Sequence, residues 1–140
     1  MSEIYAGDIT PKQAWDMLTE QENAYLIDVR TSAEWAWVGQ VDLSALEKQH
    51  LCVEWNHFPD GVPNGDFVSE VKMHVSDKDA TLLFLCRSGV RSKHAAISLT
   101  AKGYKACYNI SGGFEGDKNE HNHRGTVNGW KVAGLPWAQG

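Results

Sequence analysis

Cys86 is the residue of this chain whose surroundings most clearly predict chemistry. It ends the apolar run ATLLFLC at residues 80–86, and the next six residues, RSGVRS, bring two arginines, a glycine and the start of a helical pattern. Gly89 permits the unusual dihedrals of a tight curl, in which successive N–H groups face inward and bind an anion. The positive end of the helix, Arg87 and Arg91 all favour thiolate over thiol. The pattern therefore predicts a nucleophilic sulfur that carries negative charge, as thiolate or persulfide.

The alternative for any free cysteine is a small, buried hydrophobic residue, which is the commoner case. We expect this for Cys52 and Cys107, because each lies inside an apolar, strand-like segment with no basic loop or glycine beside it. At Cys86 a strand end, a glycine, two arginines and a helix start coincide. This coincidence favours a functional role for Cys86.

The segments around Cys86 alternate between strand-like and helix-like patterns. Apolar runs predict strands at residues 24–28, 51–58, 80–86 and 105–110. Capping boxes and helical spacing predict helices within residues 8–21, 31–37, 66–75 and 90–103. Such alternation favours an α/β fold with a mainly parallel sheet and helices on both faces. Ligands bind such sheets at the carboxyl ends of the strands, which is where Cys86 and Asp28 lie.

Composition limits the kinds of partner and compartment that we expect. A chain of 140 residues suits one domain, which we place over residues 1–140. The net charge of −5 argues against nucleic-acid binding, and no apolar run reaches the roughly 20 residues of a membrane span. The N-terminus resembles no secretory signal, and three cysteines without a CxxC pair suggest reduced thiols. We therefore predict a cytoplasmic protein without nucleic-acid or membrane partners.

Four segments together carry a resemblance to a known family. CRSGVRS resembles the active-site loop of the rhodanese (thiosulfate sulfurtransferase) superfamily, and YLIDVRTSAEW resembles its N-terminal signature. NISGGFEG resembles the segment after the last strand, and GWKVAGLPW the usual C-terminal ending. The resemblance runs from about residue 5 to residue 137. It implies a rhodanese-like, five-stranded, mainly parallel sheet with helices on both faces, with Cys86 as the catalytic residue that becomes a persulfide.

The same resemblance implies an activity and a set of site residues. A small anionic donor such as thiosulfate would give its outer sulfur to Cys86, and cyanide, a thiol or another protein's cysteine would then remove it, in two covalent steps. No cofactor is implied. The expected anion-binding loop comprises Arg87, Ser88, Gly89, Val90, Arg91 and Ser92. Arg87 and Arg91 either attract the donor or brace the loop through carboxylates.

Two other functions are alternatives to sulfur transfer. The first is a non-catalytic rhodanese-like binding or regulatory module, whose usual mark is loss of the cysteine, and Cys86 is present. The second is a phosphatase or arsenate reductase of the same fold, which needs Cys-x5-Arg so that the arginine clamps phosphate oxygens. Here the arginine falls one position earlier, at Arg91, and Ser92 takes its place. The shorter loop makes a smaller cradle, which suits a single sulfur better than phosphate.

Asp28, Arg30 and Glu34 are expected to have a structural role. Their spacing predicts that Arg30 pairs with Glu34 or a nearby carboxylate and pins the loop after the strand. Where relatives commonly have a Gly-His-Ile sequence, this chain has Gln40 in the histidine position, which affects that loop and not the cysteine chemistry.

The polar residues 117–128 form an insertion that many relatives lack. They include His121 and His123. The pair does not make a convincing metal site, because four ligands in good geometry are not evident, and we predict no bound metal. The insertion follows the last strand's carboxyl end. We therefore expect it to lie near Cys86 and to shape the access of the acceptor.

Overall fold

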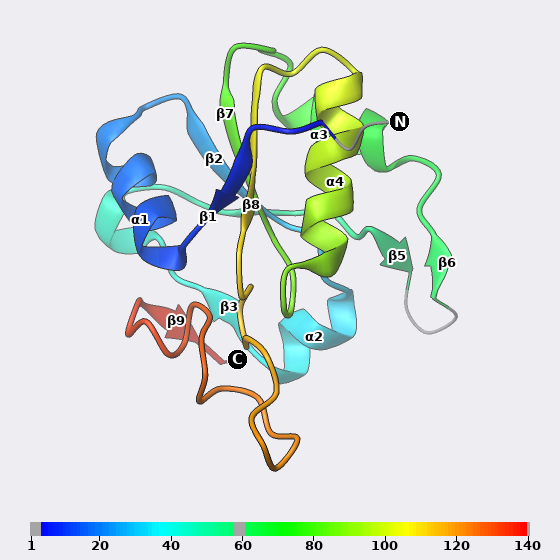
Figure 1. Cartoon of the computed structure of the whole chain (residues 1–140). Coiled ribbons are helices and arrows are strands. Elements are labelled where there is room, and N and C mark those ends of the chain that lie inside the picture. Colours follow the sequence, from blue (N-terminus) through cyan, green and yellow to red (C-terminus); the bar gives the residue numbers. More distant parts are fainter. Residues whose placement is uncertain (1–3, 58–60, 140) are drawn as a thin grey trace.

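The computed structural model describes residues 4–57 and 61–139 (Figure 1). Its main sheet has five parallel strands in the order β1-β8-β7-β2-β4, which confirms the predicted fold class. The strands are β1 (Gly7–Ile9), β2 (Ala24–Asp28), β4 (Leu51–Cys52), β7 (Thr81–Leu85) and β8 (Ala106–Ile110). Two short antiparallel pairs lie outside it: β3 (Gln40–Val41) with β9 (Trp137–Ala138), and β5 (Asn56–His57) with β6 (Val62–Pro63).

Helices cover both faces of the main sheet (Figure 1). The helix α1 (Pro11–Glu20) packs on one face, while α3 (Phe67–His74) and α4 (Val90–Ala101) pack on the other. The short helix α2 (Ser32–Trp37) follows β2, and a single 3-10 turn, η1 (Ser44–Leu46), follows β3. Both predicted capping boxes are present: Thr10 with Gln13 opens α1, and Thr31 with Glu34 opens α2.

The most apolar run of the chain contains the central strand β7. Its side chains alternate between the two faces, as the period of a strand requires. Leu82 and Phe84 join the core formed with α3 and α4, whereas Leu83 and Leu85 join the core formed with α1. Because both faces are covered, all residues of β7 are buried. Cys86 follows directly after this strand.

The single strand predicted at residues 51–58 is wrong, because two short strands, β4 and β5, lie there instead. Only Leu51 and Cys52 belong to β4, and residue 58 lies outside the described residues. The chain then folds back as the β5–β6 hairpin instead of continuing as a strand beside β2. The backbone N–H of Asn64 accordingly donates to the carbonyl oxygen of Trp55. Cys52 is exposed, contrary to expectation, because β4 is a short edge strand; Cys107 is buried as predicted. The three-residue strand β1 was not predicted from the pattern at all.

A fully buried ion pair fixes the chain just after β2. The side chains of Asp28 and Arg30 are both 0% exposed, and an Arg30 Nη2 to Asp28 Oδ2 distance of 2.7 Å joins them. Arg30 also donates to the carbonyl oxygen of Gly39 at 2.7 Å, and its guanidinium lies 4.4 Å from the ring centroid of Phe114. Of the two expected partners, Glu34 or a nearby carboxylate, Arg30 therefore pairs with the second, Asp28. The pair connects β2 with the chain before β3 and with the segment after β8.

Replacing Asp28 by asparagine tests the importance of this pair. The change leaves a buried guanidinium without its counter-charge, which costs about 3 kcal/mol or more. Urea unfolding should show a fall of that size in the free energy of unfolding. The exposed Asp16→Asn is the matched control, and it should change stability by less than about 0.5 kcal/mol. An Asp28→Asn variant as stable as the control would contradict the structural role of the pair.

Candidate functional site

The sulfur of Cys86 lies in a backbone curl between β7 and α4. Gly89 has a φ of +108°, the left-handed conformation that its lack of a side chain permits, and α4 begins at Val90. The backbone N–H of Gly89 lies 3.0 Å from Cys86 Sγ, and the hydroxyl oxygen of Ser92 lies 3.2 Å from it. Cys86 is 1% exposed. The local structure is thus the strand, curl and helix start that the sequence predicts, with the sulfur at its centre.

The two arginines of the loop have different surroundings. Arg91 contacts Glu34 through two hydrogen bonds of 2.8 and 3.0 Å. Although burial by itself raises the pKa of Glu34, the hydrogen bonds and charge of Arg91 outweigh it and leave that pKa below its ordinary value. Arg87 is exposed, and within residues 4–57 and 61–139 no hydrogen bond or ion pair joins its guanidinium to another side chain. Arg91 is therefore held by α2, while Arg87 faces solvent.

The remaining loop side chains differ in exposure. Ser88 is half-buried and Val90 is 64% exposed, whereas Ser92 is fully buried. Ser92 points from α4 toward the sulfur, and its hydroxyl oxygen also lies 2.6 Å from Oδ1 of Asn109 on β8. Within the described part of the chain, Ser92 is the one side chain of the loop that forms a hydrogen bond with the sulfur. Its neighbour Asn109 extends the polar contacts of the site to a second strand.

A glycine-rich turn holds the backbone of the loop from the other side. The N–H of Phe114 donates to the carbonyl oxygen of Cys86 at 2.8 Å, and the N–H groups of Glu115 and Gly116 both donate to that of Arg87. A Cβ on Gly113 would collide with the carbonyl groups of Cys86 and Arg87. The close approach therefore requires glycine at this position.

The insertion at residues 117–128 starts from this same turn. Figure 1 shows it in orange, projecting at the end of the sheet where α2 lies. Its two ends are joined, because the N–H of Asp117 donates to Oδ1 of Asn128 at 2.8 Å and Nδ2 of Asn128 donates back to Asp117. Arg124 donates to the carbonyl oxygen of Gly116 at 2.7 Å. The insertion therefore begins directly after Gly116, whose N–H donates to the carbonyl oxygen of Arg87.

Among the described residues, Asp28, Arg30 and Glu34 form no hydrogen bond with the Cys86 sulfur. Asp28 and Arg30 bind each other, and Glu34 reaches the loop only through Arg91. Within the described ranges, no group of three or more His, Cys, Asp or Glu side chains could hold a metal ion. No helix of residues 4–57 or 61–139 is both long and apolar enough to cross a membrane.

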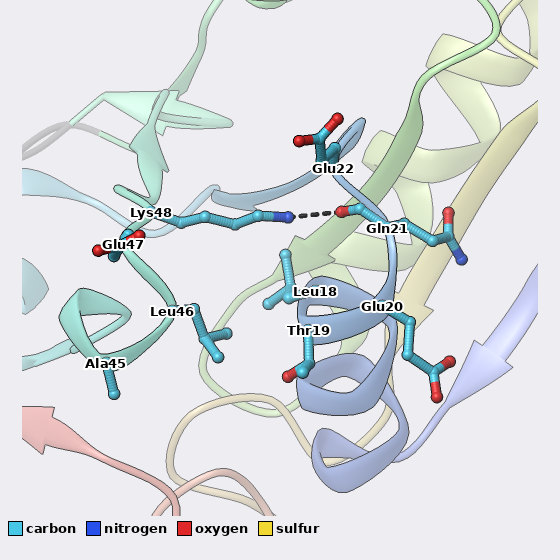
Figure 2. A pocket seen from close by; sticks show the side chains of 9 residues that line it. All are labelled: Leu18, Thr19, Glu20, Gln21, Glu22, Ala45, Leu46, Glu47 and Lys48. Atoms are coloured by element: carbon cyan, nitrogen blue, oxygen red, sulfur yellow. Dashed lines mark hydrogen bonds between the residues drawn. The ribbon is translucent and has the colours of Figure 1, made fainter.

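One hollow of the surface lies well away from these residues. Figure 2 shows a pocket between the end of α1 and residues 45–48, which include the end of η1. It has a volume of about 390 Å³ and is lined by Leu18, Leu46 and Lys48 among others. The amine of Lys48 donates to the carbonyl oxygens of Gln21 and Ala24, so two of its three N–H groups bind within the fold. None of the loop residues 86–92 lines this pocket.

Sequence reasoning missed Asn109 and the turn that holds the loop. Asn109 is 4% exposed and lies within the apolar strand segment ACYNI. A buried polar residue in a strand is unusual, and this signal was available in the sequence. The glycines of GGFEG were recognised as a family-like segment, but their contacts depend on the tertiary fold.

Comparisons with known proteins agree with this geometry. Residues 6–140 match the family described as STR4 middle domain. An uncharacterised protein of Rickettsia rickettsii is 42% identical over 131 residues, which is 93% of this chain and 95% of that protein. The crystal structure of Rv0390 from M. tuberculosis is 46% identical, with a TM-score of 0.90 over 98% of this chain and 100% of that one.

A more distant relative has a named activity. The thiosulfate sulfurtransferase GlpE of Actinobacillus pleuropneumoniae is 28% identical over 136 residues, covering 97% of this chain and 95% of that protein. The four sequence segments that resemble rhodaneses, the parallel sheet and these relatives all agree. The chain belongs to the rhodanese superfamily, within the family of the STR4 middle domain.

Proposed function

We propose that this protein is a sulfurtransferase that carries sulfane sulfur on Cys86, with thiosulfate or a similar anion as donor. The observation that carries the proposal is the place of the Cys86 sulfur, at a strand end in a curl where the N–H of Gly89 points at it. The shorter spacing between Cys86 and Arg91 supports sulfur over phosphate as the bound group. The likeness to a thiosulfate sulfurtransferase supports the same chemistry.

The reaction proceeds in two substitutions at sulfur. The Cys86 thiolate attacks the outer sulfur of thiosulfate, a sulfur–sulfur bond to Cys86 forms, and sulfite leaves with the electron pair of the broken bond. An acceptor thiolate or cyanide then attacks the outer sulfur of the persulfide and releases the Cys86 thiolate. The first substitution leaves the Cys86 persulfide and the second restores the thiolate, so ping-pong kinetics follow.

Arg91 and Arg87 have different roles in this proposal. Arg91 keeps the start of α4 against α2 through Glu34, which holds the curl in shape. Arg87 remains exposed and supplies positive charge on the solvent side of the loop. A positive charge near a site raises the encounter rate of an anionic substrate, and salt weakens this effect. Arg87 therefore attracts the donor, while Arg91 braces the loop.

Cyanide-dependent release of sulfite from thiosulfate tests the proposed function. The wild-type protein should give parallel double-reciprocal plots when both substrates are varied, and Cys86→Ser should fall to the rate of buffer alone. The exposed Cys52→Ser serves as the matched control and should retain full activity. Sulfite release by Cys86→Ser, or no thiocyanate formed by the wild type from any sulfane donor and cyanide, would overturn the proposal.

The same preparation tests the phosphatase alternative. A phosphate ester offered under identical conditions should not be hydrolysed above background, because the loop is one residue shorter than a phosphate cradle requires. Hydrolysis that depends on Cys86 would reassign the site to phosphoryl chemistry.

Arg87→Gln tests the role of the exposed arginine. We expect the KM for thiosulfate to rise about threefold to tenfold at low salt, with kcat little changed, because an exposed charge acts mainly on encounter. The difference should shrink as ionic strength increases. Lys102→Gln, an exposed basic residue at the far end of α4, should have no such effect. Equal KM values for Arg87→Gln and the wild type at low salt would exclude the role.

Deletion of residues 117–128 tests whether the insertion shapes acceptor access. The gap can be closed, because Gly116 and Gly129 are already adjacent: a Cβ on Gly129 would lie 2.8 Å from the nitrogen of Gly116. We expect the rate with a bulky thiol or protein acceptor to change severalfold relative to the rate with cyanide, since cyanide is too small to be obstructed.

A variant with His121 and His123 replaced by alanine is the control for this deletion. Both side chains are exposed, so the variant keeps the bulk of the insertion while losing its imidazoles. It should behave as the wild type does. Unchanged kinetics of the deletion variant with every acceptor would refute an access role.

A further inference from the structure

A chain of polar side chains leads from the Cys86 sulfur across two strands to the surface. Ser92 Oγ lies 3.2 Å from Cys86 Sγ and 2.6 Å from Asn109 Oδ1. Nδ2 of Asn109 donates to Oδ1 of Asp8 at 3.0 Å, and the hydroxyl of Tyr5 donates to the same Asp8 oxygen at 2.7 Å. The parallel register of β1 and β8 creates part of this chain, because it places Asp8 directly opposite Asn109.

Asp8 fixes which way the amide of Asn109 points. An ionised carboxylate only accepts hydrogen bonds, so the NH₂ group of Asn109 must face Asp8. The carbonyl oxygen Oδ1 then faces Ser92, and this oxygen also only accepts. Asn109 is 4% exposed and Ser92 is 0% exposed. A buried acceptor without a donor is costly, so Asn109 Oδ1 requires the hydrogen of the Ser92 hydroxyl.

The single hydrogen of Ser92 is therefore directed away from the sulfur. The shorter of its two contacts, 2.6 Å, is the one to Asn109. What Ser92 presents to Cys86 is a lone pair, which accepts a hydrogen bond from a thiol S–H but repels a thiolate. To stabilise a thiolate, Ser92 must turn its hydrogen to the sulfur and leave Asn109 Oδ1 unpaired. The chain of contacts thus withholds the Ser92 hydrogen from a sulfur that already receives the N–H of Gly89.

We propose that Asn109 and Asp8 are positioning residues that direct the hydrogen of the Ser92 hydroxyl away from Cys86, so that in the resting protein the sulfur receives the N–H of Gly89 but not the hydroxyl of Ser92. The proposal deepens the proposed function, because it concerns the sulfur that carries out the transfer. It does not depend on turnover, since the protonation state of Cys86 can be measured without any sulfur donor. Neither Asn109 nor Asp8 touches the sulfur, so both act through Ser92.

Other charged groups also act on the Cys86 sulfur and must be kept constant. Arg91 from α4 interacts electrostatically with Cys86 and with Asp28 at the end of β2, and Glu34 from α2 neutralises Arg91. Arg87 lies within the loop itself. None of these groups belongs to the chain from Ser92 to Asp8, so substitutions in that chain leave them in place.

Titration of the thiolate by its ultraviolet absorbance tests the proposal, with the Cys86→Ala spectrum subtracted so that only Cys86 is followed. Asn109→Leu removes the acceptor at similar volume and frees Ser92 to donate to the thiolate. Because a hydrogen bond to a charged group changes an equilibrium about tenfold, the midpoint of titration should move down by about one pH unit. A midpoint that stays unchanged or moves up overturns the proposal.

A double-mutant cycle shows whether the effect passes through Ser92. In a Ser92→Ala background, Asn109→Leu should no longer move the midpoint, because no hydroxyl remains to be redirected. A shift of the same size in both backgrounds would mean that Asn109 acts on Cys86 by another route and would overturn the proposal.

Asp8→Asn provides a second variant that perturbs the core less, because Asp8 is exposed. An asparagine at residue 8 allows the Asn109 amide to turn, so that Nδ2 faces Ser92 and the hydroxyl donates to the sulfur. We expect a downward shift that is larger with Ser92 present than in the Ser92→Ala background, where only the lost charge of Asp8 remains. Equal shifts in the two backgrounds would contradict the proposal, even if Asn109→Leu does not fold.

Discussion

The parallel register of three neighbouring strands determines what can meet at the Cys86 sulfur. Asp28 on β2 lies opposite Leu85 on β7, and Phe84 on β7 lies opposite Asn109 on β8. The three strands therefore end together, and the residue after Leu85 is the cysteine. A slip of one residue would turn each side chain to the opposite face of the sheet. Cys86, Ser92 and Asn109 come together only in the observed register.

The loop around the sulfur is held from two sides by contacts that do not involve the sulfur itself. The N–H groups of residues 114–116 bind the carbonyl oxygens of Cys86 and Arg87, and Glu34 binds Arg91. These contacts hold the backbone of the loop in place around the sulfur, as a precisely positioned reactive group requires. The buried pair of Asp28 and Arg30 supports this arrangement indirectly, since the guanidinium of Arg30 packs on Phe114.

The sequence predicted the local features of this site better than its long-range contacts. The helix start after Gly89, both capping boxes and the buried strand before Cys86 depend on neighbouring residues, and all are present. The sequence left open whether Arg30 pairs with Glu34 or another carboxylate, and the predicted end of β4 was wrong, because both depend on which carboxylate and which backbone the fold brings near. Asn109 was missed for the same reason, since its role appears only when β1, β8 and α4 are packed together.

The central claim is that Cys86 accepts a sulfur atom, and intact mass measurement tests it most directly. After incubation with thiosulfate and removal of small molecules, the wild-type protein should gain the mass of one sulfur atom, and fragmentation should place it on Cys86. Treatment with cyanide should restore the original mass. A Cys86→Ala variant that gains the same mass, or a wild-type protein whose added sulfur lies on Cys52 or Cys107, would contradict the account.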